Sequence, residues 1–371
     1  MNHTDQFIEA CPGTTGFNPR PNDDEHNRNS KLADAAGEPP INFIIGISGC
    51  SSAGKTTLSL LLDVVLRKAF HGISSCPPHK PPDVTVIHQD TYFLQHIPHP
   101  QMVTIRPRWP EDRLVAHMAG PDDPLSIRVE DRDCVSCCDV ELLTRHVEEP
   151  GARPSGYDIP APDVAPATPE VALGGLEAGT LEKVVEGLQG VILRGEGDKG
   201  DSACASAVAC RVTIVEGFTL LARDTEQENT DTGSEARNLR ALRELQERLD
   251  VALFLPVNHD EARARRFRRR KYRDEPEGYR KPGEFWKCAA YFDQVAWPHY
   301  ERYHKYILSN LADAYARRDA GQQDKDLCID GTHVRPPGAI SVDDTLIWAV
   351  RIVGTALAAR LWDETGITRG P

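Results

Sequence analysis

INFIIGISGCSSAGKTTLSLLLDVVLRKAF, residues 41–70, places a short apolar run, a glycine-rich turn and an amphipathic segment in immediate succession. The apolar run at residues 41–48 has the length and composition of a buried parallel strand. Residues 56–70 carry apolar side chains at helical spacing, and those that form one face are Leu58, Leu61, Leu62 and Val65. The stretch therefore predicts a strand, a tight turn and a helix.

The turn matches the pattern G-x-x-x-x-G-K-[ST] from Gly49 to Thr56. Glycines let successive backbone N–H groups point at phosphate oxygens, and the amino end of the following helix adds partial positive charge. We expect Lys55 to reach the β- and γ-phosphates of ATP and the Thr56 hydroxyl to bind Mg²⁺. The loop residues expected to contact ATP are Gly49, Ser51, Ser52, Ala53, Gly54, Lys55, Thr56 and Thr57. A plain glycine-rich turn with an exposed lysine is the alternative.

Two further apolar runs, at residues 84–87 and 212–215, are each followed closely by an acidic residue. The first leads to Asp90 and the second to Glu216. Ligands gather where parallel strands end, so a carboxylate there can accept a proton from a substrate hydroxyl or help hold Mg²⁺. The alternatives are a turn-capping Asp and a helix-capping or loop Glu.

Additional strands are predicted at residues 251–255 and, more weakly, 327–330, and the intervening helices at 139–148 and 234–249. Strands that alternate with helices favour a parallel sheet with right-handed crossovers. Residues 95–130, rich in proline and charge, are interpreted as an extended loop. The sequence thus predicts one α/β domain with five strands.

The expected domain runs from residue 41 to about 365, after a polar, disordered tail at residues 1–40. Three segments interrupt it: a proline- and alanine-rich insertion at about 149–180, and polar loops at about 195–210 and 222–234. The insertion at about 149–180 carries no recognisable chemical motif.

The whole chain has 371 residues and a formal net charge of −13, from 43 Lys and Arg against 56 Asp and Glu. This balance argues against a general nucleic-acid coat. We expect neither a secretory signal nor a membrane-spanning helix, and ten scattered cysteines favour reduced thiols. A cytoplasmic protein is expected, with the nucleus as the alternative.

Eight cationic side chains lie between Arg263 and Arg273. Phosphoryl transfer needs cations that close over the γ-phosphate, neutralise charge and exclude water. The alternatives are a solvated helix face and a nuclear-import or nucleic-acid patch. The run contains only two aromatic residues, Phe267 and Tyr272, and this limited interleaving weakens the case for single-stranded nucleic acid.

Four motifs together resemble the nicotinamide riboside kinases: GISGCSSAGKTT, VIHQDTYF, IVEGFTLL and YFDQVAWPHYERY. These kinases belong with the uridine kinases to a larger group of P-loop nucleoside kinases. The resemblance covers residues 41–74, 84–93, a weaker patch at 130–141, and 212–332. It implies a doubly wound P-loop kinase fold with a mostly parallel five-stranded sheet and a mobile arginine-rich lid. The implied reaction transfers the γ-phosphate of ATP to a nucleoside 5′-hydroxyl.

The resemblance also implies roles for single residues. Asp90 matches the general base, and the implied Mg²⁺ site consists of Thr56, Asp90 and Glu216. Arg266 and Arg270 match lid positions that contact ATP, and Lys55 and Arg266 join Asp90 as implied catalytic residues. The residues matched to the substrate pocket are Asp90, Tyr92, Phe93 and Asp133, of which Asp133 would hold the ribose hydroxyls.

The pocket motif departs from the family at Arg132, which stands where the family has an aromatic residue that stacks on the base. Nicotinamide riboside carries a cationic ring that an aromatic face attracts. A guanidinium stacked there would cost about 1 kcal/mol or more. Arg132 could instead point to solvent, another ring such as Tyr92 or Trp109 could replace the aromatic, or the acceptor could differ.

We therefore expect an enzyme that phosphorylates nicotinamide riboside to nicotinamide mononucleotide in NAD salvage, with ATP and Mg²⁺ as cofactors. A uridine or cytidine kinase and a non-catalytic ATP-binding protein are the alternatives. The expected partner is the small nucleoside, with neither membrane nor nucleic acid.

Cys134-x-x-Cys137-Cys138 has no second ligand pair for zinc, so ordinary loop thiols are predicted. Asp330-Gly331-Thr332 resembles the adenine-side loop, with a plain turn as the alternative.

Overall fold

The computed structural model describes residues 41–73, 83–94, 101–106, 126–149, 168–193, 210–224, 233–269, 272, 285–319, 327–337 and 341–365. The tail predicted at residues 1–40 lies outside these ranges, as do residues 150–167, 194–209 and 225–232 of the predicted insertion and polar loops. All elements named below belong to the unit that begins at residue 40.

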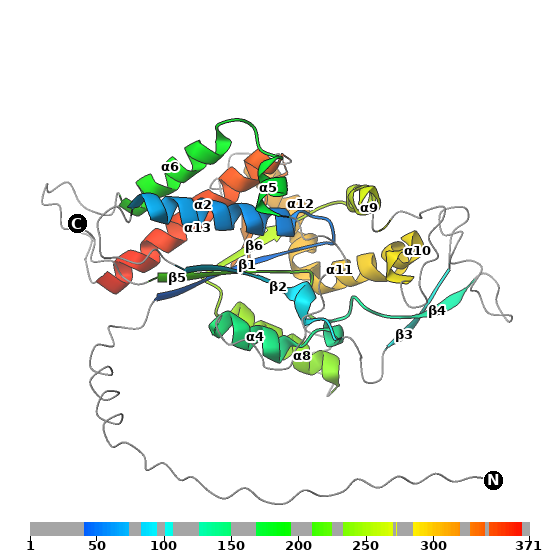
Figure 1. Cartoon of the computed structure of the whole chain (residues 1–371). Helices are drawn as coiled ribbons and strands as arrows, with labels where there is room; N and C mark the ends of the chain where they lie inside the picture. Colours follow the sequence, from blue (N-terminus) through cyan, green and yellow to red (C-terminus); the bar gives the residue numbers. More distant parts are fainter. Residues whose placement is uncertain are drawn as a thin grey trace, which may run out of the picture. The chain divides into compact units, whose positions relative to one another are not determined.

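Six strands form a mostly parallel sheet in the order β2-β5-β1-β6-β8-β7 (Figure 1). Their bounds are β1 Ile41–Gly49, β2 Asp83–His88, β5 Cys210–Gly217, β6 Val251–Leu255, β7 Cys328–Ile329 and β8 Thr332–Val334. Neighbouring strands are parallel except for β7 and β8. The predicted α/β class and the first four predicted strands are confirmed, because a parallel sheet covered on both faces needs continuous apolar runs.

The prediction of five strands is wrong, because the segment at 327–330 is a hairpin arm and not a parallel strand. The chain turns at Asp330 (φ 49°) and Gly331 (φ 76°), two residue types that tolerate the left-handed region. β8 then runs parallel to β6, with Thr332 beside Ala252. Asp330 and Gly331 therefore precede the parallel strand, which begins at Thr332.

One face of the sheet is covered by α2 (Lys55–Ile73) and α13 (Val342–Thr365) (Figure 1). α5 (Pro169–Leu173) packs on α2, and α6 (Thr180–Leu193) packs on α2 and α13. The predicted insertion at 149–180 is thus partly helical. The Thr168 hydroxyl caps α5 by accepting from the Val171 backbone N–H, and Pro169 occupies the first helical turn, where its missing N–H costs nothing. Ala172 and Leu188 join the core against α2, which explains why this segment folds.

The opposite face is covered by α4 (Val140–Glu148) and α8 (Ser234–Gln246) (Figure 1). Side chains of β1 alternate between the two faces, as the period of a strand requires. Phe43 and Ile45 pack in the cluster around α2, whereas Ile44 packs with Leu143 and Leu242 in the cluster around α4 and α8. These helices confirm the predictions at 139–148 and 234–249, and Asp139 caps α4 through the Leu142 backbone N–H.

The interpretation of residues 95–130 as a loop is also wrong in part. β3 (Met102–Ile105) and β4 (Ile127–Glu130) form an antiparallel ribbon. Ile105 and Ile127 face each other and are buried in the main core, so two separated apolar residues stabilise the pairing. The ribbon leads directly into the segment that contains Asp133.

The carboxyl edge of the sheet is covered by α9 (His259–Arg268), α10 (Ala289–Tyr291), a π-helical turn at Phe292–Ala296 and α11 (Trp297–Tyr303) (Figure 1). α12 (Lys305–Asp319) follows. The described helices include none with the length and apolarity needed to span a bilayer. The carboxyl edge, where α9 meets the loop after β1, is where the predicted site residues converge.

Candidate functional site

The loop from Gly49 to Thr56 joins the carboxyl end of β1 to α2. Its backbone enters the positive-φ region at Gly49 (150°), Ser52 (68°) and Gly54 (101°). A Cβ at Gly49 would lie 2.6 Å from the Leu255 carbonyl oxygen, so this position requires glycine. Ser52 adopts a conformation that costs a non-glycine residue about 1 kcal/mol or more. Such a loop turns successive N–H groups into a concave anion site.

The Lys55 side chain bonds to the backbone of this loop. Its buried ammonium donates to the Gly49 carbonyl (3.1 Å) and to the Cys50 carbonyl (3.0 Å). The ammonium has a third proton to offer a ligand. Ser52 Oγ is buried and has no hydrogen-bond partner among the described residues. A phosphate oxygen in the loop would satisfy such a group, so the loop fits the phosphates of ATP.

Glu216 lies beside the loop at the end of β5. Its Oε1 accepts from Thr56 Oγ1 (3.0 Å) and lies 2.8 Å from His88 Nδ1. Burial alone would raise the pKa of Glu216, but the hydrogen bond with His88 and the charge of Lys55 outweigh it, so the pKa lies below its ordinary value. The same hydrogen bond raises the pKa of His88. The structure therefore holds an ionised carboxylate next to the Thr56 hydroxyl.

Asp90 is exposed on the first turn of the 3₁₀ helix Gln89–Tyr92, two residues beyond His88. β2 lies next to β5, with His88 beside Glu216. Asp90 thus shares the sheet edge with Glu216, and its charge helps to raise the pKa of His88. One hydroxyl and two carboxylates fit Mg²⁺, which keeps several waters and binds substrate phosphates.

Gln89 is a site residue that sequence reasoning missed. Its side chain lies over Gly217, donates to Thr219 Oγ1 (2.8 Å) and accepts from the Thr219 backbone N–H (3.0 Å). These bonds fix the turn that carries Asp90 to the loop after β5. The pairing joins residues 130 positions apart, which no local pattern in the sequence reveals.

Arg266 reaches the phosphate loop from α9. Its Nη1 donates to Ser51 Oγ (2.7 Å) and its Nη2 to the Trp286 carbonyl (2.8 Å). The guanidinium lies over the rings of Tyr272 and Phe292, at 4.3 and 5.3 Å from their centroids. The structure thus brings the predicted lid arginine to the loop, while Arg270, also predicted to contact ATP, lies outside the described residues.

Asp133 lies in the segment that follows β4. Burial raises its pKa, against the opposing charge of Arg266, and its carboxyl group hydrogen-bonds with Tyr291. Asp131, which sequence reasoning missed, is fully buried: its Oδ1 accepts from the Asp133 backbone N–H (3.1 Å), and its Oδ2 lies 2.6 Å from His299 Nε2. The His299 ring thereby fixes the backbone that carries Asp133.

The Arg132 side chain is about a third exposed (35%) and pairs with Glu130 through Nη2 and Oε2 (2.6 Å). Its charge is therefore compensated. Tyr92 does not replace the missing aromatic, because its ring is buried in the α4–α8 cluster and its hydroxyl bonds to His146 Nδ1 (2.6 Å). Phe93 is half-buried and bridges to Cys138, and Trp109 lies outside the described residues.

His304 packs beneath the phosphate loop and contacts Ser48, near the end of β1. It is fully buried, with Nε2 3.3 Å from Ser48 Oγ and Nδ1 3.0 Å from the Tyr300 carbonyl oxygen. Burial lowers its pKa from 6.5 to about 4, so the folded protein holds a neutral ring at pH 7. The unfolded chain binds a proton at this histidine below about pH 6.5.

We predict that His304 makes the protein less stable in mild acid. Between pH 6.5 and 4 the unfolded state binds more protons, so the free energy of unfolding falls as the pH falls. From pH 7.5 to 5.0 the loss is about 2 kcal/mol for wild type relative to His304→Gln, measured by urea unfolding at both pH values. Equal losses for the two proteins would contradict the prediction.

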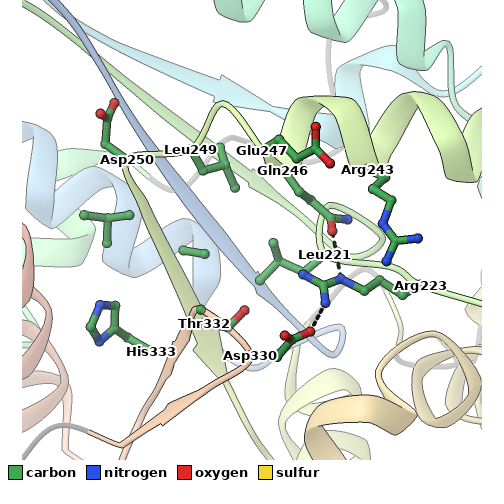
Figure 2. Close-up of a pocket in the computed structure, with 13 residues that line it drawn as sticks. Leu221, Arg223, Arg243, Gln246, Glu247, Leu249, Asp250, Asp330, Thr332 and His333 are labelled. Atoms are coloured by element: carbon green, nitrogen blue, oxygen red, sulfur yellow. Dashed lines mark hydrogen bonds and ion pairs between the residues drawn. The ribbon is translucent and has the colours of Figure 1, made fainter.

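A cavity of about 320 Å³ lies elsewhere on the sheet, near the amino ends of β6 and β8 (Figure 2). Arg223 crosses it, donates to Gln246 Oε1 (3.1 Å) and pairs with Asp330. Thr332 lies beside Ala252, whereas the phosphate loop begins beside Leu255, three residues and about 10 Å farther along β6. The structure therefore does not bring the Asp330 turn, which resembles an adenine-side loop, to the phosphate loop.

No protein-family model matches the sequence, and no curated protein matches it. Within the described part of the chain, no three His, Cys, Asp or Glu side chains cluster in a way that could hold a metal ion. A metal at this site would thus depend on the Thr56 hydroxyl, on two separate carboxylates and on phosphate and water oxygens.

Proposed function

We propose that the chain is an ATP- and Mg²⁺-dependent kinase that phosphorylates the 5′-hydroxyl of a nucleoside, with nicotinamide riboside as the preferred acceptor. The observation that carries the proposal is the convergence of three groups on one loop. Lys55 binds the loop carbonyls, Arg266 binds Ser51, and the Thr56 hydroxyl bonds to an ionised Glu216. Two cations and a metal-ligand pair around an anion cradle favour phosphoryl transfer over other chemistry.

The fold is consistent with the proposed kinase but does not by itself specify an activity. The phosphate loop follows the central strand β1, and helices cover both faces of the mostly parallel sheet. This arrangement is compatible with a doubly wound P-loop kinase, in which ligands bind where the strands end.

Each residue has a distinct part in the proposed reaction. Lys55 and Arg266 stabilise the negative charge of the transferred group, and the buried setting of both side chains strengthens that attraction. Asp90 accepts the proton of the acceptor hydroxyl. Mg²⁺, when bound, neutralises charge on the β- and γ-phosphates, and Thr56, Asp90 and Glu216 would hold it.

The charge of Arg132 next to the proposed acceptor pocket is compensated, because its guanidinium is paired with Glu130. Compensated in this way, Arg132 repels a pyridinium ring less than an isolated guanidinium would. The replaced aromatic still removes one attraction for that ring, so a uridine or cytidine kinase is the second candidate.

The proposal is tested by ADP release from ATP and Mg²⁺ with nicotinamide riboside, uridine or cytidine as acceptor, and with none. We expect release that depends on the nucleoside and is fastest with nicotinamide riboside. Release with a pyrimidine nucleoside alone would keep the reaction and change the substrate. ATP binding without nucleoside-dependent release would contradict the kinase and favour a non-catalytic ATP-binding protein.

Arg266 gives a prediction within this proposal. Arg266→Ala removes the donor to Ser51, and we expect kcat/KM for ATP to fall about 100-fold. Arg268→Ala on the same helix, at an exposed position, is the matched control and should change kcat/KM little. Thermal unfolding of both variants separates lost catalysis from lost folding. Equal kcat/KM values for ATP in the two variants would show that Arg266 does not contribute to the reaction.

A further inference from the structure

Two thiols lie side by side next to the acceptor segment. Cys134 directly precedes the 3₁₀ helix Val135–Cys137, and Cys137 ends it. Their Sγ atoms are 2.9 Å apart, within about 1 Å of the length of a disulfide bond. The third cysteine of the segment, Cys138, has no such neighbour in the described residues: its side chain packs in the α4–α8 cluster.

The pair is joined to Asp131. The Cys137 thiol lies 3.0 Å from the Asp131 carbonyl oxygen and the Cys134 thiol 3.7 Å from it. The carboxylate of the same residue holds His299 and the backbone N–H of Asp133. A change at the two sulfurs therefore acts on the residue that fixes Asp133.

The two thiols differ in acidity. The hydrogen bond from Cys137 lowers the pKa of Cys134, and the same contact raises the pKa of Cys137. The thiolate is the nucleophilic form of cysteine, so Cys134 is the sulfur suited to attack and Cys137 the one suited to resolve. Both side chains are buried, which restricts the reaction to a small oxidant and slows it.

We propose that Cys134 and Cys137 are a dithiol site that a hydroperoxide converts reversibly into an intramolecular disulfide. The Cys134 sulfur attacks the peroxide O–O bond, forms a sulfenic acid and releases water or an alcohol. The Cys137 sulfur then attacks the Cys134 sulfur, the S–S bond forms, and the hydroxyl leaves as water with the Cys137 proton. Two electrons pass from the two sulfurs to the peroxide.

Oxidation removes the Cys137 thiol proton, so the Asp131 carbonyl loses the nearer of its two thiol contacts as a donor. This consequence rests on the proposed function: with Asp133 in the acceptor pocket, we expect the disulfide to raise KM for the nucleoside more than KM for ATP. The disulfide itself does not depend on that function.

The test maps the bond in the full-length chain. Reduced protein is treated with hydrogen peroxide, its remaining thiols are alkylated, and tryptic peptides are analysed by mass spectrometry. The peptide from Asp133 to Arg145 contains all three cysteines, Cys134, Cys137 and Cys138. We expect a form in which Cys138 alone is alkylated, which a dithiol reductant converts back to the triply alkylated form.

Single cysteine-to-serine variants show which two cysteines form the disulfide. Cys134→Ser and Cys137→Ser should abolish the linked form, and Cys138→Ser, the matched neighbour, should retain it. The exposed Cys328 thiol reports that the oxidant is active. Full alkylation of all three cysteines while Cys328 is oxidised, or a bond to Cys138, would overturn the dithiol site.

Kinetics of the mapped disulfide test the consequence. An unchanged nucleoside KM in the fully oxidised protein would overturn the link through Asp131. A reduced protein that forms the disulfide but lacks kinase activity would contradict the proposed function and leave the dithiol site supported.

Discussion

Lys55→Met is expected to lower kcat about 1,000-fold, the loss of about 4 kcal/mol of transition-state stabilisation. The substitution keeps a long, flexible side chain but removes the ammonium that binds the Gly49 and Cys50 carbonyls. It also removes a positive charge that lowers the pKa of Glu216, so the metal-ligand pair is weakened at the same time. Steady-state ADP release with saturating nucleoside measures the effect.

Lys68→Met is the matched control, because Lys68 is exposed on the same helix α2. Its kcat should stay within about twofold of wild type, since a solvated lysine contributes little. If Lys55→Met kept wild-type kcat with normal ATP binding, the loop would not serve phosphoryl transfer.

Asp90→Asn is expected to lower kcat by about 100- to 10,000-fold, the range of a lost general base. The amide preserves shape but cannot take the acceptor proton. ATP affinity should change far less, because Lys55 and Arg266 bind the phosphate loop. Single-turnover transfer and an independent ATP-binding titration separate the two effects.

Asp83→Asn serves as the control at the opposite, exposed end of β2 and should leave both measurements unchanged. A parallel loss of ATP affinity in Asp90→Asn would assign the residue to the metal site alone. Retention of full kcat would exclude Asp90 as the base.

The sequence predicted the centre of the fold better than its edges. Continuous apolar runs mark β1, β2, β5 and β6 because strands covered on both faces must be apolar throughout. β7 and β8 have two and three residues, too few for a periodic pattern. The ribbon of β3 and β4 was missed because its partners are separated in sequence and each contributes four residues.

The same distinction applies to the site. Lys55 and Thr56 belong to a local motif, and Glu216 and Asp90 follow strands, so their shared edge follows from topology. The bond between Asp131 and His299 joins residues 168 positions apart and depends on how α11 packs against the segment after β4. Such tertiary contacts have no sequence signal, and the pairing of Arg132 with Glu130 is likewise visible only in the folded chain.

The most direct test follows the γ-phosphate. The full-length chain is incubated with γ-labelled ATP, Mg²⁺ and nicotinamide riboside, and the labelled products are separated and treated with a 5′-nucleotidase. The proposed function predicts label in a nucleoside monophosphate, released by the nucleotidase, with no transfer by Lys55→Met. Label that stays in ATP, or appears as inorganic phosphate at a rate independent of any nucleoside, would contradict it.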